Sequence, residues 1–170
     1  MKRFLLQMHG ESGAGKSTLA LAVGETTGAV VINKDHITGP LIEEGVLQLG
    51  AGPGFAVFYT LAESLLSQGF SVVLDSGCFW QAILDRGHSL ASQFDVDYRL
   101  VECCCPDSAE QEARLKTRSR FVGQPASRTE LNASLSRPGV LLEIAEPHLV
   151  VDTTQPLQAC VDQVLGYLEG

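Results

Sequence analysis

A glycine-rich run near the N-terminus constrains the fold of this chain more than any other feature. Residues 10–18 read Gly-Glu-Ser-Gly-Ala-Gly-Lys-Ser-Thr, a complete Gly-x-x-x-x-Gly-Lys-Ser/Thr pattern. An apolar run from Phe4 to Met8 precedes it, and a run typical of a helix, Thr18 to Glu25, follows it. A glycine-rich turn between a strand and a helix points backbone N–H groups and the positive end of the helix dipole at a phosphate. The sequence therefore predicts a nucleoside triphosphate as ligand.

Individual residues of this run have expected roles. Lys16 supplies a positive charge to the outer phosphates, and the Ser17 hydroxyl is suited to ligate Mg²⁺. The alternative is a glycine-rich turn that matches the pattern by chance, which the flanking strand and helix argue against. We therefore predict ATP and Mg²⁺ as cofactors. The residues expected to bind the nucleotide are Gly10, Glu11, Ser12, Gly13, Ala14, Gly15, Lys16, Ser17, Thr18 and Arg114.

The rest of the chain predicts an α/β fold in three layers. Apolar runs of strand length alternate with helical patterns, which indicates a parallel sheet covered by helices on both faces. The length of 170 residues suits one domain, so we predict a single domain over residues 1–170. The strands are expected at residues 3–8, 29–33, 71–75, 97–105 and 148–152, and the clearest helices at 55–68 and from Leu157 to Leu168.

Two segments lack a regular pattern. Residues 39–54 carry five glycines and two prolines, which predicts a loop or a broken helix. Residues 121–139 also contain glycines and prolines among polar residues. Irregular segments of this length in a compact domain are commonly lids or binding loops, with surface disorder as the alternative.

Charge and cysteine content exclude several classes of protein. A net charge of −8 argues against a broad nucleic-acid-binding surface. No stretch approaches the roughly 18 apolar residues of a membrane span, so we expect no membrane partner. Cys103, Cys104 and Cys105 are adjacent in an expected strand, where neighbouring side chains face opposite sides, so we interpret them as small hydrophobic residues rather than metal ligands. The sequence predicts a cytoplasmic, reduced protein.

Asp35 follows the second expected strand, at the sheet edge where open α/β folds bind ligands. A carboxylate there can orient an acceptor hydroxyl and take its proton as a phosphoryl group is transferred. The alternatives are a helix N-cap for the residues from 36 onward and the ribose-binding acid of a dinucleotide fold. The Lys16-Ser17 pair, which a dinucleotide site does not need, disfavours the second alternative.

Two further residues lie at the ends of expected strands. Asp75 closes the third strand, as an acid that holds Mg²⁺ through water does, and the alternative is a turn-forming Asp before Ser76-Gly77. We therefore predict Ser17 and Asp75 as the metal site. His9 ends the first strand and is either a site residue or a hydrogen-bonded core histidine.

Half of the basic residues lie in one stretch. Six of the twelve Lys and Arg fall between positions 114 and 137, which indicates a small anionic ligand or a solvated helix face. A helix between Asp107 and Arg120 would place Arg114 and Arg118 on one face, suited either to neutralise a transferring phosphoryl group or to pair with Glu110 and Glu112. We predict a lid over about residues 114–137. The candidate catalytic residues are Lys16, Asp35, Arg118 and Arg120.

In order and spacing, these features resemble the small P-loop kinases among the AAA-domain-containing P-loop NTPases. They are the 10–18 loop, Asp35, Asp75, the arginine-bearing helix and the closing run from His148 to Thr154. The nearest resemblance is to the branch of chloramphenicol phosphotransferase-like enzymes, zeta toxin-like kinases and the kinase domain of polynucleotide kinases. It implies a five-stranded parallel sheet of order 2-3-1-4-5, a helical lid that brings arginines to the phosphates, and an adenine site near residues 153–156.

The resemblance implies an ATP-dependent kinase that transfers the γ-phosphoryl group to a hydroxyl of a small-molecule acceptor, with Asp35 as base or hydroxyl orienter. The chain departs from that branch at Thr38, where many members carry an arginine, so an acceptor phosphate held from this position is not expected. The alternative is a P-loop module that binds and slowly hydrolyses ATP as a switch without its own acceptor.

Overall fold

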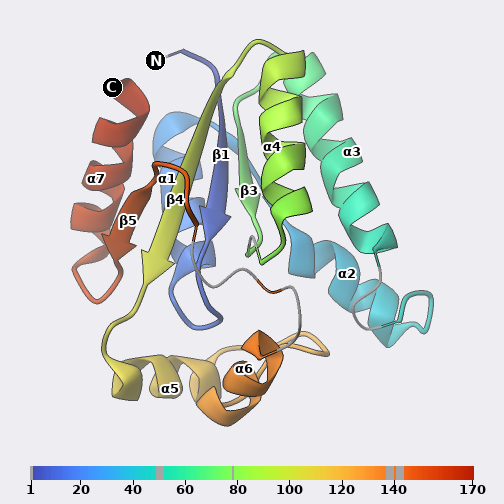
Figure 1. The fold of residues 1–170 in the computed structure, drawn as a ribbon, viewed down its shortest axis with the longest axis vertical. Helices are drawn as coiled ribbons and strands as arrows, with labels where there is room; N and C mark the ends of the chain where they lie inside the picture. Colours follow the sequence, from blue (N-terminus) through green and yellow to red (C-terminus); the bar gives the residue numbers. More distant parts are fainter. Residues whose placement is uncertain (1, 49–51, 78, 137–139, 141–143) are drawn as a thin grey trace.

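The computed structural model describes residues 2–48, 52–77, 79–136, 140 and 144–170. In these residues strands and helices alternate along the chain (Figure 1). The strands are β1 (Phe4–His9), β2 (Val30–Asn33), β3 (Val72–Asp75), β4 (Asp97–Cys104) and β5 (Leu149–Asp152). The helices are α1 (Lys16–Thr27), α2 (Lys34–Glu43), α3 (Pro53–Ser67), α4 (Gln81–Gln93), α5 (Ser108–Thr117), α6 (Arg128–Leu135) and α7 (Leu157–Glu169). Of the described helices, none is long and apolar enough to cross a bilayer.

The strands form one sheet of order β2-β3-β1-β4-β5, and every pairing is parallel. The predicted order 2-3-1-4-5 is therefore confirmed, and each predicted strand lies within one residue of its observed bounds. β1 lies at the centre and all its residues are buried, as its continuous apolar run requires. Because parallel strands end at the same edge, the residues that follow β1, β2 and β3 meet there.

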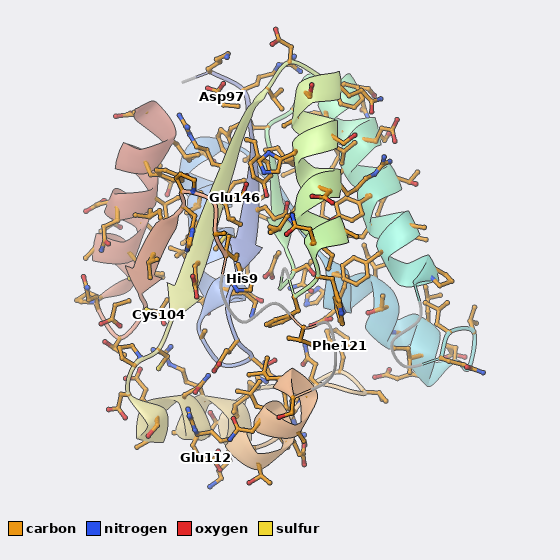
Figure 2. All side chains as sticks on the ribbon, in the orientation of Figure 1. His9, Asp97, Cys104, Glu112, Phe121 and Glu146 are labelled. Carbon is orange, nitrogen blue, oxygen red and sulfur yellow. The ribbon has the colours of Figure 1, made fainter. Side chains whose placement is uncertain are left out.

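Helices cover both faces of the sheet and give the predicted three layers (Figure 1). Leu6 and Met8 point from β1 into a core formed with α1 and α7. The alternate residue Leu5 points the other way, into a core formed with α3 and α4. Side chains fill the regions between the sheet and the helices on each face (Figure 2). The alternation of Leu5 with Leu6 follows from the two-residue period of a strand.

The segment expected to be a loop or a broken helix is helical at both ends. α2 continues through Pro40 to Glu43, and a turn follows with Gly45 at φ 72°. α3 begins at Pro53, two residues before the predicted start, because proline suits the first turn of a helix. Residues 49–51 of the predicted loop lie outside the described residues.

The second irregular segment contains a helix that the prediction missed. α6 is capped by Ser127, whose Oγ accepts a hydrogen bond from the Glu130 N–H at 3.3 Å. The Glu130 carboxylate in turn accepts from the N–H of Ala126 at 2.8 Å. Ser-x-x-Glu is the capping-box pattern, and it was the signal available for this helix. Residues 137–139 lie outside the described residues.

The predicted helix between Asp107 and Arg120 is shorter than expected. Its N-cap is Asp107, but α5 ends at Thr117, and Arg118 already has extended backbone angles, φ −68° and ψ 148°. Arg114 and Arg118 therefore do not share a helix face, which corrects the prediction. α5 and α6 lie below the carboxyl ends of the strands, across from the loop that connects β1 to α1 (Figure 1).

Candidate nucleotide and acceptor site

The loop between β1 and α1 has the backbone that its glycines permit. Gly10 and Gly15 have φ angles of 125° and 84°, which other residues rarely adopt. A Cβ on Gly10 would lie 2.2 Å from the carbonyl oxygen of Cys103 in β4, so the close approach also requires glycine. Gly15 precedes α1, and no side chain in the described part of the chain caps this helix. Its first N–H groups are therefore free of a side-chain partner, as an anion site at a helix N-terminus requires.

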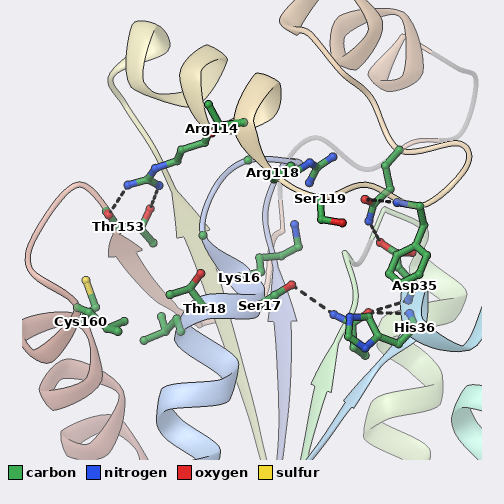
Figure 3. A pocket seen from close by; sticks show the side chains of 18 of the residues that line it. Lys16, Ser17, Thr18, Asp35, His36, Arg114, Arg118, Ser119, Thr153 and Cys160 are labelled. Atoms are coloured by element: carbon green, nitrogen blue, oxygen red, sulfur yellow. Dashed lines mark hydrogen bonds between the residues drawn. The ribbon is translucent and has the colours of Figure 1, made fainter. Parts of the chain in front are cut away.

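The side chain of Lys16 folds back over the phosphate loop. Its Nζ donates hydrogen bonds to the carbonyl oxygens of Gly10 at 2.8 Å and Glu11 at 2.9 Å. Burial lowers the pKa of Lys16, and the carboxylates of Asp75 and Asp35 act in the opposite direction. Figure 3 shows this ammonium group between Thr153 on one side and Asp35 on the other.

Ser17 and Asp75 lie together, as their predicted metal-binding role requires. Asp75 is 4% exposed and its carboxylate accepts hydrogen bonds from the side chains of Ser17 and Asn33. Burial raises the pKa of Asp75, while these hydrogen bonds and the charge of Lys16 oppose the rise. A hydroxyl and a carboxylate are the hard oxygen ligands that Mg²⁺ prefers beside phosphates and water. The residues present therefore fit a magnesium ion.

Asp35 lies in the first turn of α2. The N-cap of this helix is Asn33, which corrects the alternative in which Asp35 is the cap. The Asp35 carboxylate pairs with Lys34 Nζ at 2.6 Å and accepts a hydrogen bond from Gln124 Nε2 at 2.5 Å. Burial is the largest single effect and would raise the pKa of Asp35. The charge of Lys34 and the hydrogen bonds from Lys34 and Gln124 together outweigh it, and the pKa falls below its usual value. The carboxylate is thus ionised near pH 7 and able to accept a hydrogen bond from a hydroxyl.

A tight turn at residues 121–124, here called the lid turn, brings Gln124 to Asp35. The Phe121 N–H donates to Gln124 Oε1 at 3.2 Å, and the Gln124 N–H donates to the Phe121 carbonyl at the same distance. The Phe121 ring packs edge-on against His36, with ring centroids 5.2 Å apart. Sequence reasoning did not find these two residues, because the contact joins segments far apart in the chain.

The three candidate arginines occupy different places. Arg114 donates to the Thr153 hydroxyl at 2.9 Å and carbonyl at 2.8 Å, and it also pairs with Glu110. Arg118 lines the cavity, donates to the carbonyl of Pro125 at 3.1 Å, and has a buried Nε without a partner among the described residues. Burial lowers the pKa of Arg118. Arg120 is exposed and lies outside the set of residues that line the cavity.

One cavity of about 590 Å³ is lined by Lys16, Ser17, Asp35, Arg118, Gln124 and Thr153, whereas Asp75 and Arg120 lie outside its lining. Its volume is in the range of small-molecule sites. Figure 3 shows Thr153 and Cys160 at one end, Lys16 and Ser17 in the middle, and Asp35 and His36 at the other end. Thr153 lies in the predicted adenine-binding segment, and its hydroxyl also donates to the carbonyl of Ala14 in the phosphate loop at 2.9 Å.

Two residues at the inner side of the loop belong to the core. His9 is 3% exposed, and burial lowers its pKa to about 4, so the ring is neutral near pH 7. It packs edge-on against Phe79, with centroids 5.4 Å apart. Cys103 is buried, and burial raises its pKa to about 12, which suits its interpretation as a small hydrophobic residue.

Solved structures with the same fold include several kinases. A sugar kinase from Janibacter sp. HTCC2649 shares 19% identity at a TM-score of 0.68, covering 99% of this chain and 95% of that one. A gluconokinase from Sinorhizobium meliloti 1021 shares 21% identity at a TM-score of 0.65, covering 99% of this chain and 94% of that one. The Mycobacterium tuberculosis APS kinase, solved with AMPPNP and APS, shares 16% identity at a TM-score of 0.63, covering 99% of both chains. At these identities the likeness shows the fold.

Sequence comparison places the chain in a family. Among curated proteins there is no significant match. A protein-family model described as an AAA domain, AAA_33, matches residues 5–138, which is most of the chain. The finer placement in the chloramphenicol phosphotransferase-like branch stays a prediction. The chain therefore belongs to the AAA_33 family of AAA domains and has the fold of the P-loop kinases.

Proposed function

We propose that this protein is an ATP-dependent kinase that transfers the γ-phosphoryl group to a hydroxyl of a small molecule. The observation that carries the proposal is that Asp35 lines the same cavity as Lys16 and Ser17 of the phosphate loop. The phosphate loop is sufficient to bind a nucleotide, and Asp35 is not needed for that. An ionised carboxylate at the far end of the cavity is suited to orient an acceptor hydroxyl.

The chain's residues divide the work of binding along the cavity. The N–H groups of residues 10–16 and the charge of Lys16 hold the outer phosphates, and the adenine lies toward Thr153. Ser17 and Asp75 hold Mg²⁺, which when bound neutralises charge on the transferring phosphates. Arg118, which lines the cavity, adds positive charge near the transferred group.

Arg114 has a positioning role in this proposal. It ties Thr153 to α5, and Thr153 in turn contacts the phosphate loop at Ala14. Arg120 lies outside the cavity lining and reaches the phosphates only if the segment from 114 to 137 moves as a lid. We include this lid, and a single domain over residues 1–170, in the proposal.

Two observations favour the kinase over the ATPase switch. The carboxylate of Asp35 is held ionised by Lys34 and Gln124 together, an arrangement that a switch without an acceptor does not need. The gluconokinase and the APS kinase that share the fold act on small molecules, which supports the same class here. Placement in the chloramphenicol phosphotransferase-like branch is a finer form of the same proposal.

Replacing Asp35 tests the function. We expect Asp35→Asn to keep the affinity for ATP but to lower kcat by about 10²–10⁴-fold, the usual contribution of a positioned base. The loss should lie at the low end if proton transfer is late in a loose transition state. The measurement is ADP release with and without a panel of sugars, nucleosides and antibiotics, alongside calorimetric ATP binding.

The matched control is Asp162→Asn, an exposed acid on α7 outside the cavity lining. It should leave both ATP affinity and kcat unchanged. Full turnover of Asp35→Asn with the acceptor would show that Asp35 is not the base. ADP release that no acceptor accelerates would instead favour the ATPase switch.

A further inference from the structure

The side chain of Asn33, at the end of β2, makes hydrogen bonds in two directions. Its Oδ1 accepts from the N–H groups of Asp35 at 2.9 Å and His36 at 3.1 Å and thereby caps α2. Its Nδ2 donates to Ser17 Oγ at 3.3 Å (Figure 3) and to the carboxylate of Asp75. One amide therefore touches both the residues proposed to hold the metal and the helix that carries the proposed base.

The sheet register brings these groups together. Asn33 and Asp75 are partners across the parallel pair β2–β3, so their side chains stand side by side at the carboxyl edge of the sheet. Ser17 lies in the first turn of α1, directly after the phosphate loop. The contact thus joins three elements that converge at the cavity.

The chemistry of the position requires an acceptor and a donor at once. The N–H groups at the start of α2 need an acceptor, and the buried carboxylate of Asp75 needs a donor. An amide provides both and carries no charge. Once Oδ1 is held by the helix, Nδ2 can point only toward Asp75 and Ser17, which orients the carboxylate through a hydrogen bond to a charged group.

We propose that Asn33 is a positioning residue that couples the proposed metal pair, Ser17 and Asp75, to the proposed base, Asp35. The proposal rests on the proposed function. Because the same side chain holds Asp75 and the start of α2, the residues that would hold the metal and the helix turn that carries Asp35 are fixed relative to one another. Loss of the donor alone should loosen the metal pair while leaving α2 capped.

Serine and alanine substitutions separate the two hydrogen-bonding roles. Asn33→Ser keeps an oxygen that caps a helix well but is too short to donate to Asp75, whereas Asn33→Ala loses both roles. Asn132→Ser, on the exposed side of α6, is the matched control. The probe is the non-hydrolysable analogue AMPPNP, titrated calorimetrically in EDTA and at increasing Mg²⁺, so that the first measurement does not depend on activity.

We expect Asn33→Ser to bind AMPPNP in EDTA as wild type does, and to need about tenfold more Mg²⁺ for half of the metal-dependent gain in affinity, the cost of one hydrogen bond to a charged group. The control should keep the wild-type Mg²⁺ midpoint. Asn33→Ala should show the same Mg²⁺ shift and a lower melting temperature than Asn33→Ser. With an acceptor in hand, kcat should fall in both variants while the KM for the acceptor rises only in Asn33→Ala.

An unchanged Mg²⁺ midpoint in Asn33→Ser would overturn the proposal, whatever its kcat. A midpoint shift equal to that of Asn132→Ser would do the same. Failure of the proposed function looks different. In that case wild-type protein binds AMPPNP with Mg²⁺ but phosphorylates no acceptor, and the shift in Asn33→Ser is still measurable.

Discussion

Burial and neighbouring charge set the ionisation of single residues around the phosphate loop. His9 and Cys103 lie beneath the loop, and burial keeps the first deprotonated and the second protonated near pH 7. At Asp35, which lines the cavity, the charge of Lys34 and the hydrogen bonds from Lys34 and Gln124 together keep the carboxylate ionised against the effect of burial. The groups under the loop therefore add no charge of their own, and the negative charge is placed where an acceptor hydroxyl is expected.

The buried histidine predicts a dependence of stability on acidity. The pKa of His9 falls from 6.5 to about 4 on folding, so the unfolded chain binds a proton between these values that the folded chain does not. The contribution of His9 to the free energy of unfolding is therefore fully present above pH 6.5 and is lost as the pH falls toward 4. This contribution is about 3 kcal/mol at most. Between pH 7 and 4.5 the free energy of unfolding should fall in both proteins, and the fall should be about 2 kcal/mol smaller in His9→Asn than in wild type.

Urea unfolding at the two pH values measures this difference. His36→Asn, in which an exposed ring is replaced, serves as the control and should follow wild type. The same pH dependence in His9→Asn and wild type would show that the ring is protonated in the folded protein.

At the scale of elements, the lid turn packs on α2 through a glycine. Gly39 lies inside the helix, where glycine costs roughly 1 kcal/mol relative to alanine. A Cβ at this position would lie 2.2 Å from the Phe121 ring. The glycine therefore lets Phe121 seat against α2, which in turn places Gln124 on Asp35.

We expect Gly39→Ala to release the lid turn without unfolding the protein. The added methyl group favours the helix but displaces Phe121, so the amide of Gln124 should exchange hydrogen at least tenfold faster, while the melting temperature stays within a few degrees of wild type. Hydrogen exchange followed by mass spectrometry over residues 118–127 measures the effect.

Gly166→Ala is the matched control, because an added Cβ on Gly166 in α7 would meet no atom of the described residues within 4 Å apart from its own helix. It should leave exchange in the lid turn unchanged. Slow exchange of Gln124 in Gly39→Ala would mean that Phe121 is accommodated elsewhere and that the contact with α2 does not hold the turn.

At the scale of the whole molecule, the cavity joins segments from both ends of the chain. The phosphate loop follows the central strand, α5 and the lid turn lie across the carboxyl edge of the sheet, and residues 153–160 follow the last strand. A ligand that contacts all of these in the folded state only will stabilise the fold as a whole, by an amount set by its concentration relative to its dissociation constant.

We expect ATP with Mg²⁺ at about 100 times its dissociation constant to raise the melting temperature by roughly 5–10 °C. Lys16→Ala should lose most of this rise because it removes the ammonium group proposed to contact the outer phosphates. Lys116→Ala, which removes a lysine paired with Glu112 outside the cavity lining, is the control and should keep the full rise. Equal thermal shifts in wild type and Lys16→Ala would contradict the proposed binding mode.

Local patterns were sufficient to predict most of the framework. The apolar run before Gly10 indicated β1, the glycine and lysine spacing indicated the phosphate loop, and each strand lay within one residue of its prediction because period and apolarity are properties of neighbouring residues. The order of the strands came from the family resemblance and not from these patterns. α6 was missed because the glycines and prolines around it outweighed a short capping signal at Ser127.

The composition of the cavity depended on the tertiary structure. Chain order placed Asp35 and Asp75 at strand ends, but the bridge that Asn33 makes between α2 and Asp75 exists because β2 and β3 pair in one particular register. Gln124 reaches Asp35 because a turn 89 residues later in the chain packs on α2. Periodicity and motif spacing report contacts between residues close in sequence, whereas these hydrogen bonds join residues that only the packing of distant elements brings within 4 Å of one another.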